Sequence, residues 1–206
     1  ALINYLALLG WNPGGEEELF SLNELAVLFS LEGINKAGGR FDPERCKWFN
    51  QQHLHKADST LVESSLDQLL HQKGIDNPSV STADVVRLVQ DRLTLLTDLW
   101  DETCFFFIAP VEYDEEATRK QWKEETPQIL SAVMNCIENA PSTNAETLSV
   151  VIKLWASENN IRLGMIMAPL RIALVGALKG PSVFAICGVL GKDECVRRIA
   201  AAIDKI

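Results

Sequence analysis

The 206-residue sequence lacks the short motifs on which most enzymes depend. It contains no G-x-S-x-G elbow, no H-E-x-x-H zinc motif, no Walker loop and no G-x-G-x-x-G turn. Its glycine pairs, Gly14-Gly15 and Gly38-Gly39, are not followed by the residues that a phosphate-binding loop requires. We therefore expect no catalytic residue within this chain, and we regard a self-contained enzyme of another class as the weakest interpretation.

Cysteine and histidine are scarce and poorly spaced for metal binding. No two of the five cysteines are closer than the eight residues between Cys187 and Cys195, so there is no C-x-x-C pair. His53 and His55 are two apart, which would place them on different faces of a helix. We expect no metal site, and we expect reduced thiols, most of them buried, in a cytoplasmic protein.

Long apolar runs are also missing. The longest candidate, Met165 to Leu178, is interrupted by Pro169 and Arg171, and no run reaches the roughly 18–20 residues of a membrane helix. No secretory signal pattern is present, so we expect no membrane partner. The sequence starts without Met inside an apolar pattern, and we expect the natural protein to continue upstream of Ala1.

The chain is acidic, with a formal net charge of −9. Taken alone, this charge argues against nucleic acid as a partner. Net charge describes the whole surface, however, whereas a binding face is local. The acidic runs lie at Glu16 to Glu18 and Asp114 to Glu125. If the chain binds a polyanion, its basic residues should gather on one side of the fold.

Helix signals recur along the chain and predict an all-α fold. Ser21 with Glu24 forms a capping box, and Asp42-Pro43 places proline at a first helical position. Helices are expected to begin near Ser21, Asp42, Asp58 or Ser59, Ser81, Glu115, Pro127, Glu146, Val183 and Glu194. The fourth carries apolar residues as far as Leu96, and the run from Cys104 to Ile108 fits a strand or the end of a buried helix.

Short antiparallel helices of this kind typically assemble into a cage. The best linkers are Lys56 to Thr60 and Ala109 to Asp114, which divide the chain into three pieces. One segment, Arg45 to His53, alternates cations, aromatic residues and amides. Such a face suits phosphates, riboses and bases, although composition alone favours an ordinary amphipathic helix with Trp48 partly in the core.

Three strings resemble bacterial glutamyl-tRNA synthetases. They are ALINYLALLGWNP (Ala1 to Pro13), ELFSLNELAVLFSLEGINKAGGRFDPERCKWFNQQHL (Glu18 to Leu54) and APLRIALVGALKGPSVFAICGVLGKDECVRRI (Ala168 to Ile199). The second is similar to the family's stem-contact region, including Asn35-Lys36-Ala37-Gly38, and the third to its closing anticodon-binding segment. The likeness is looser from Asp58 to Asn160.

The resemblance implies a helical stem-contact segment (1–57) followed by a cage of two helical anticodon-binding subdomains (58–110 and 111–206). It implies that the full-length protein attaches glutamate to tRNA-Glu with ATP and Mg²⁺. The family's ATP-binding signatures are absent from this chain, so the chain alone should be inactive and hold no cofactor. The expected partner is tRNA-Glu, bound by a monomer with no affinity for DNA. A helical scaffold or protein-interaction module is the competing hypothesis.

The resemblance also assigns roles to individual residues. The residues that it places against the tRNA stem are Arg45, Lys47, Trp48 and Asn50. Arg171 should read an anticodon base, Arg92 with Thr94 should read the anticodon as well, and Val183 should pack on a base. An arginine suits such reading because its planar fork bonds two acceptors on a base edge. The bland alternatives are a capping or ion-pairing role for Arg171 and plain packing for Val183.

The sequence departs from the family at Gly33, where a basic residue or histidine is usual. We expect this glycine to weaken a local contact or to free the loop.

Overall fold

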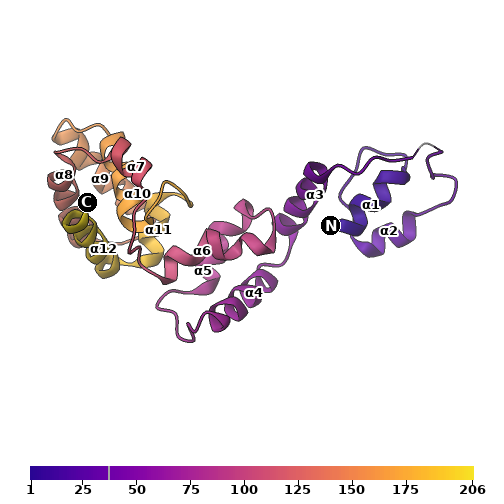
Figure 1. The fold of residues 1–206 in the computed structure, drawn as a ribbon, viewed down its shortest axis with the longest axis horizontal. Helices are drawn as coiled ribbons and strands as arrows, with labels where there is room; N and C mark the ends of the chain where they lie inside the picture. Colours follow the sequence, from indigo (N-terminus) through magenta and orange to yellow (C-terminus); the bar gives the residue numbers. More distant parts are fainter. Residues whose placement is uncertain (37) are drawn as a thin grey trace.

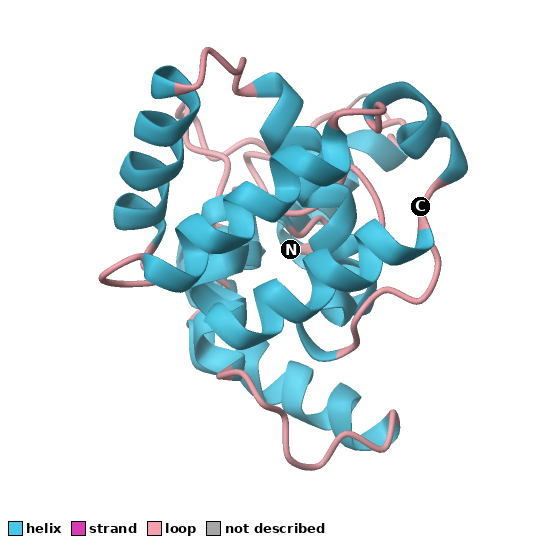
Figure 2. Ribbon diagram, turned by 90° about the vertical axis from the view of Figure 1, so that its left-hand side faces the viewer, coloured by secondary structure: helices cyan, strands magenta, loops and turns pink. Residues whose placement is uncertain are grey.

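The computed structural model describes residues 1–36 and 38–206, so Ala37 of the resembled string lies outside the described residues. Twelve α-helices and two 3₁₀-helices make up the described chain, and its only extended pairing is an isolated antiparallel bridge between Trp11 and Ile34. The molecule is elongated, with the two termini in opposite halves (Figure 1). A view along the long axis shows helices and loops alone (Figure 2). The expected all-α class is confirmed.

The first part of the chain contains three helices, α1 (Leu2–Gly10), α2 (Leu22–Leu28) and α3 (Pro43–Lys56). The predicted capping box is present: the Ser21 hydroxyl accepts from the Glu24 amide, and the Glu24 carboxylate accepts from the Ser21 amide. Asp42 accepts from the first amides of α3, whose first residue is Pro43. Both helix starts therefore lie where the sequence predicted them.

The middle of the chain contains α4 (Ser59–Gln72), α5 (Thr82–Val89), the 3₁₀-helices η1 (Gln90–Arg92) and η2 (Leu96–Asp98), and α6 (Leu99–Phe107). The prediction that the fourth helix continues to Leu96 is wrong, because α5 ends at Val89. The 3₁₀ turn after it brings Leu93 into the core, fully buried. The run at 104–108, for which the sequence left a strand or the end of a buried helix open, forms the end of α6.

The last part contains six helices around the largest share of the core. They are α7 (Glu115–Gln121), α8 (Thr126–Asn139), α9 (Ala145–Glu158), α10 (Gly164–Val175), α11 (Val183–Leu190) and α12 (Lys192–Lys205). Pro169 lies inside α10. Gly176 and Gly180 lie at the two ends of the loop between α10 and α11, with φ angles of 86° and 92°. Residues other than glycine rarely adopt such positive φ angles.

The apolar core is divided unequally. One continuous cluster runs from Leu54 at the end of α3 to Ala202 in α12. A second, small cluster of Trp11, Phe20 and Leu25 stabilises the N-terminal helices. Because the two clusters are separate, the attachment of α1 and α2 to the rest depends largely on α3, which lies between them (Figure 1).

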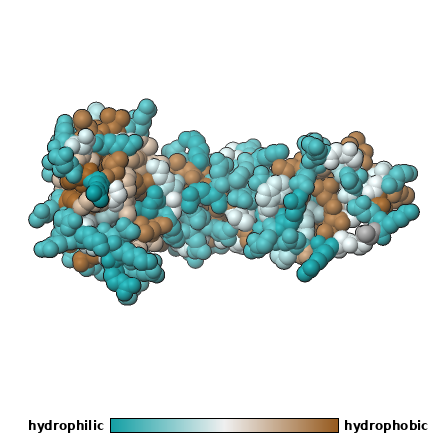
Figure 3. Space-filling model, turned by 90° about the horizontal axis from the view of Figure 1, so that it is seen from above, coloured by the Kyte–Doolittle hydropathy of each residue, from teal (hydrophilic) through white to brown (hydrophobic). Residues whose placement is uncertain are grey.

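The N-terminal part also leaves many apolar side chains exposed. Brown surface lies over this end of the molecule in the space-filling view (Figure 3). The large exposed apolar residues of α1, α2 and the following loop are Leu2, Ile3, Leu6, Leu22, Val27, Leu28, Phe29, Leu31, Ile34 and Phe41.

Gly33 has a packing role that the sequence did not reveal. A Cβ at this position would lie 2.5 Å from Nε1 of Trp11 and 2.8 Å from the Asn12 carbonyl oxygen. The Gly33 carbonyl accepts from the Asn12 amide, beside the Trp11–Ile34 bridge. The expectation that this glycine frees the loop is therefore wrong: its lack of a side chain lets the loop close against Trp11.

Candidate nucleic-acid interface

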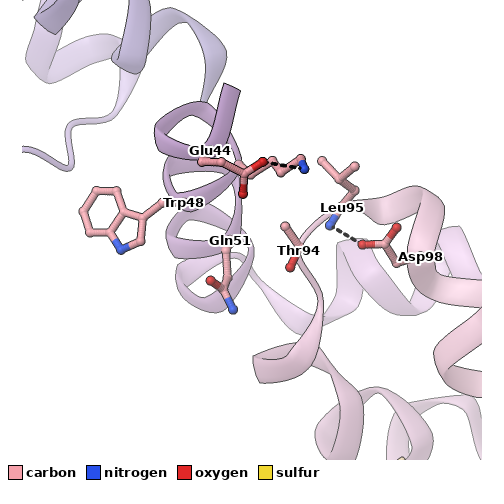
Figure 4. Close-up of a pocket in the computed structure, with 7 residues that line it drawn as sticks. Glu44, Trp48, Gln51, Thr94, Leu95 and Asp98 are labelled. Atoms are coloured by element: carbon pink, nitrogen blue, oxygen red, sulfur yellow. Dashed lines mark hydrogen bonds and ion pairs between the residues drawn. The ribbon is translucent and has the colours of Figure 1, made fainter. Parts of the chain in front are cut away.

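A cleft of about 570 Å³ lies between α3 and the segment that joins η1 to η2. Figure 4 shows Glu44, Trp48 and Gln51 projecting from α3, with Thr94, Leu95 and Asp98 on the opposite wall. Lys47 also lines it. Three of the predicted contact residues, Lys47, Trp48 and Thr94, thus come from segments far apart in the sequence and line one cavity.

The exposed face of α3 carries an aromatic residue beside two cations. The Trp48 ring is 37% exposed, and the guanidinium carbon of Arg45 lies 5.2 Å from its centroid. Arg45 pairs with Glu18, and the Lys47 amine bonds Glu44 Oε1 at 2.9 Å, which raises the pKa of Lys47. Exposed pairs of this kind are typically worth less than about 1 kcal/mol. Phosphate oxygens can therefore replace the carboxylates at little cost.

Asn50 and Thr94 contact each other. The Asn50 side-chain amide donates to the Thr94 backbone carbonyl and joins α3 to the segment after η1. Both were predicted to touch RNA, and the structure shows in addition that Asn50 connects two elements.

Arg92 and Arg171 influence one another electrostatically. Burial lowers the pKa of Arg171, and the positive charge of Arg92 lowers it further. Arg92 is exposed and pairs through Nε with the Glu102 carboxylate at 3.3 Å. The two cations raise the local positive potential, which favours an anionic ligand.

Arg171 also clamps the loop between α10 and α11. Its Nη1 donates to the carbonyls of Lys179 (2.9 Å), Gly180 (3.2 Å) and Pro181 (2.6 Å). Within the described residues, Nε and Nη2 of Arg171 make no hydrogen bond to protein. One edge of the guanidinium therefore fixes the loop while the other remains available to a ligand.

The clamped loop depends on residues that the sequence interpretation missed. Lys179 donates from Nζ to the Asp101 carbonyl at 2.8 Å, which fastens the loop to α6. Gly180 packs on the Phe105 ring, where a Cβ would come within 2.9 Å. Val183 begins α11 and is only 3% exposed. Its side chain therefore packs in the core, which is the alternative to a contact with an anticodon base. The Gly-Pro step was a turn signal, but nothing local indicated these partners.

Arg45 lies on α3 beside Glu18, Arg92 ends η1 beside Glu102, and Arg171 lies on α10. The gathering of all three cations on one side stays a prediction. In the part of the chain that the structure describes, no three His, Cys, Asp or Glu side chains form a metal-binding group. The described residues also include no helix long and apolar enough to cross a bilayer.

The fold and these surfaces define a helical recognition module with cations at a clamped loop and on an exposed helix. A family model for the anticodon binding domain matches residues 45–203. This chain belongs to that family.

Relatives narrow the assignment. The glutamate–tRNA ligase of Flavobacterium johnsoniae is 43% identical over 206 residues, which cover 100% of this chain and 41% of the relative. The glutamate–tRNA ligase of Flavobacterium psychrophilum is 48% identical over 206 residues, and the match covers 98% of this chain and 40% of the relative. The crystal structure of a glutamate tRNA ligase from Elizabethkingia meningosepticum, in complex with its amino acid, superposes with a TM-score of 0.91 at 33% sequence identity. The superposition covers 98% of this chain and 40% of that structure's chain.

The chain thus spans about two fifths of the length of these relatives. The resemblance seen in the sequence is confirmed: the chain corresponds to the anticodon-binding part of bacterial glutamate–tRNA ligases.

Proposed function

We propose that this chain recognises tRNA-Glu, as the anticodon-reading and stem-contacting part of a longer glutamate–tRNA ligase. The observation that carries the proposal is the clamp of Arg171 on the loop before α11, which occupies Nη1 and leaves Nε and Nη2 without a hydrogen bond among the described residues. Residues 1–57 would contact the stem, and 58–110 and 111–206 would form two anticodon-binding subdomains. The complex would contain one copy of the chain, in the cytoplasm, and no DNA.

The whole enzyme would attach glutamate with ATP and Mg²⁺, chemistry that lies outside this chain. The family's ATP-binding signatures are absent from this sequence, so we assign no step of that reaction to its residues. We propose that the chain alone binds tRNA without catalysing ligation.

Anticodon reading would use the free edge of Arg171. Nη1 is occupied by three loop carbonyls, whereas Nε and Nη2 can donate to a base edge. Unstacked anticodon bases expose those edges. Arg92 would supply a second fork, and Thr94, two residues later, and the clamped loop that ends at Val183 would also contact the anticodon.

Stem contact would use the exposed face of α3. Arg45 and Lys47 would exchange Glu18 and Glu44 for phosphates, with Trp48 and Asn50 beside them. Such contacts hold the RNA in register without reading its sequence.

The test is fluorescence anisotropy with a tRNA-Glu transcript and an anticodon-substituted transcript, using Arg171→Lys. A lysine ammonium has three donors and can still bond the loop carbonyls, but it lacks the second edge of the fork. We expect Arg171→Lys to stay folded and to lose about 10-fold or more of the preference for the native anticodon, which is the typical value of one bidentate base contact. Arg119→Lys, on the exposed face of α7, is the matched control.

A salt series completes the test, because log affinity falls by roughly 0.7–0.9 per unit of log salt for each phosphate neutralised. Equal and weak binding of both transcripts by the unmodified chain would refute anticodon reading and favour the scaffold hypothesis. An unchanged preference in Arg171→Lys would refute the role of that residue.

A further inference from the structure

One buried amide lies at the joint between α3 and the helical body. Gln90 is only 6% exposed, one of few polar residues in the described interior. It begins η1, the 3₁₀ turn whose third residue is Arg92. Its side chain is thus two residues from a proposed anticodon-reading arginine, but it points to a different partner.

That partner is the C-terminal end of α3. Nε2 of Gln90 donates one hydrogen to the Leu54 carbonyl and the other to the Ala57 carbonyl, both at 2.9 Å. The Leu54 carbonyl also accepts from the Ala57 backbone amide at 3.2 Å, so Gln90 is its second donor. A single amide therefore bonds two main-chain acceptors near the end of α3 and ties this helix to η1.

Polar side chains also join α3 to α1, at both ends of α3. The Tyr5 hydroxyl donates to the Asp42 carbonyl at 3.1 Å and accepts from the Asp42 amide at 2.6 Å. A ring nitrogen of His53 bonds Asn4 Oδ1 at 2.9 Å, and Asn4 is itself buried. Polar contacts thus fix α3 to α1, whereas Gln90 and Asn50 fix it to the body.

Apolar packing holds α3 on both sides. Leu54 belongs to the large core cluster, and Phe49, only 1% exposed, packs against the Tyr5 ring of α1 with the ring centroids 5.6 Å apart. Hydrogen bonds, unlike apolar contacts, specify an orientation. The amides of Gln90 and Asn50 therefore add directional contacts between α3 and the segment around Arg92.

We infer that Gln90 is a positioning residue for tRNA recognition: it holds the stem-contacting face and the anticodon-reading arginines at a fixed separation, so that one RNA engages both. This inference depends on the proposed function. Two surfaces held at a matched distance bind a ligand that spans them far more tightly than either alone, because the second contact becomes intramolecular. Loosening the joint lowers the effective concentration without removing any RNA contact.

The experiment compares Gln90→Met, which keeps the length of the side chain but not its donors, with Gln68→Met, an exposed glutamine on α4. Affinities are measured for the whole tRNA-Glu transcript and for its isolated anticodon stem-loop. We expect Gln90→Met to lose about 10-fold for the whole tRNA and less than about 2-fold for the stem-loop, with Gln68→Met unchanged. Equal losses for both RNAs, or no loss for either, would overturn the inference.

Small-angle X-ray scattering of the free chain provides a test that does not depend on RNA. Gln90→Met should broaden the distribution of the longest intramolecular distances, and an unchanged profile would overturn the positioning role. If the unmodified chain shows no anticodon preference while Gln90→Met broadens the distance distribution, the proposed function fails, but the role of Gln90 in fixing α3 to the helical body is retained. Should Gln90→Met lose its helical circular dichroism, Gln90→Asn replaces it. Its shorter amide reaches one carbonyl at most and should give an intermediate effect.

Discussion

The buried arginine Arg198 should contribute far more to the stability of the fold than the exposed arginines do. Arg198 on α12 is only 2% exposed. Its Nη1 donates to the Phe105 carbonyl at 2.5 Å and the Leu174 carbonyl at 2.8 Å, and its Nε bonds Glu194 at 2.6 Å. One guanidinium therefore connects α12 with α6 and α10. We expect Arg198→Met to be among the most destabilising single changes in the chain.

The magnitude follows from what the methionine leaves behind. Breaking a buried ion pair costs about 3–5 kcal/mol when the partner remains buried and uncompensated. Glu194 is partly exposed and keeps Arg197 as a partner, so the penalty falls on the two carbonyls, each worth about 1–3 kcal/mol unpaired. We therefore expect a loss of about 3 kcal/mol, or roughly 6–12 °C in Tm for a chain of this size.

The assay is urea unfolding followed by circular dichroism, with Arg197→Met as the control. Arg197 bonds the same carboxylate but is exposed, and its loss should cost less than about 1 kcal/mol. Similar free energies of unfolding for the two variants would refute the reasoning, because they would mean that burial of the Arg198 hydrogen bonds adds nothing.

Two further outcomes can be measured. Hydrogen bonds from Arg197, and then those from Arg198, hold the pKa of Glu194 below its ordinary value of 4.5. The carboxylate therefore stabilises the fold above that value, and the contribution is lost as pH falls through the lower folded pKa. Glu194→Gln should be less stable than the unmodified chain in neutral urea titrations, with the difference shrinking below about pH 4.5. Gly33→Ala should lower the free energy of unfolding by about 1–3 kcal/mol, because the added methyl group overpacks against Trp11. Hydrogen exchange should become faster in residues 1–36 and stay unchanged in α8 to α12. An equal change in exchange throughout the chain would contradict the packing role of Gly33.

Local features of the fold could be predicted because they are recorded within a few residues. Ser21 with Glu24, and Asp42 with Pro43, start helices through contacts that span three positions at most. The end of α5 could not, since Leu93 continues the apolar pattern although a 3₁₀ turn carries it into the core. Apolar spacing alone does not distinguish these two geometries.

The candidate site shows the same division. The resemblance identified Arg171 and Arg92, whose contacts with the anticodon stay a prediction. The loop clamp could not be foreseen, because Arg171 bonds main-chain carbonyls, which every residue carries and no sequence pattern marks. Gln90 escaped notice for the same reason.

That reliance on main-chain acceptors has an evolutionary consequence. The carbonyls of Leu54 and Ala57 persist whatever side chains those positions carry, so Gln90 can keep its bonds while the surface of α3 diversifies. If α3 contacts the tRNA stem as proposed, a lineage could alter the strength of that contact by substitutions on α3, without realigning the helical body behind it. The joint would connect a surface that is free to vary with a body that keeps its geometry.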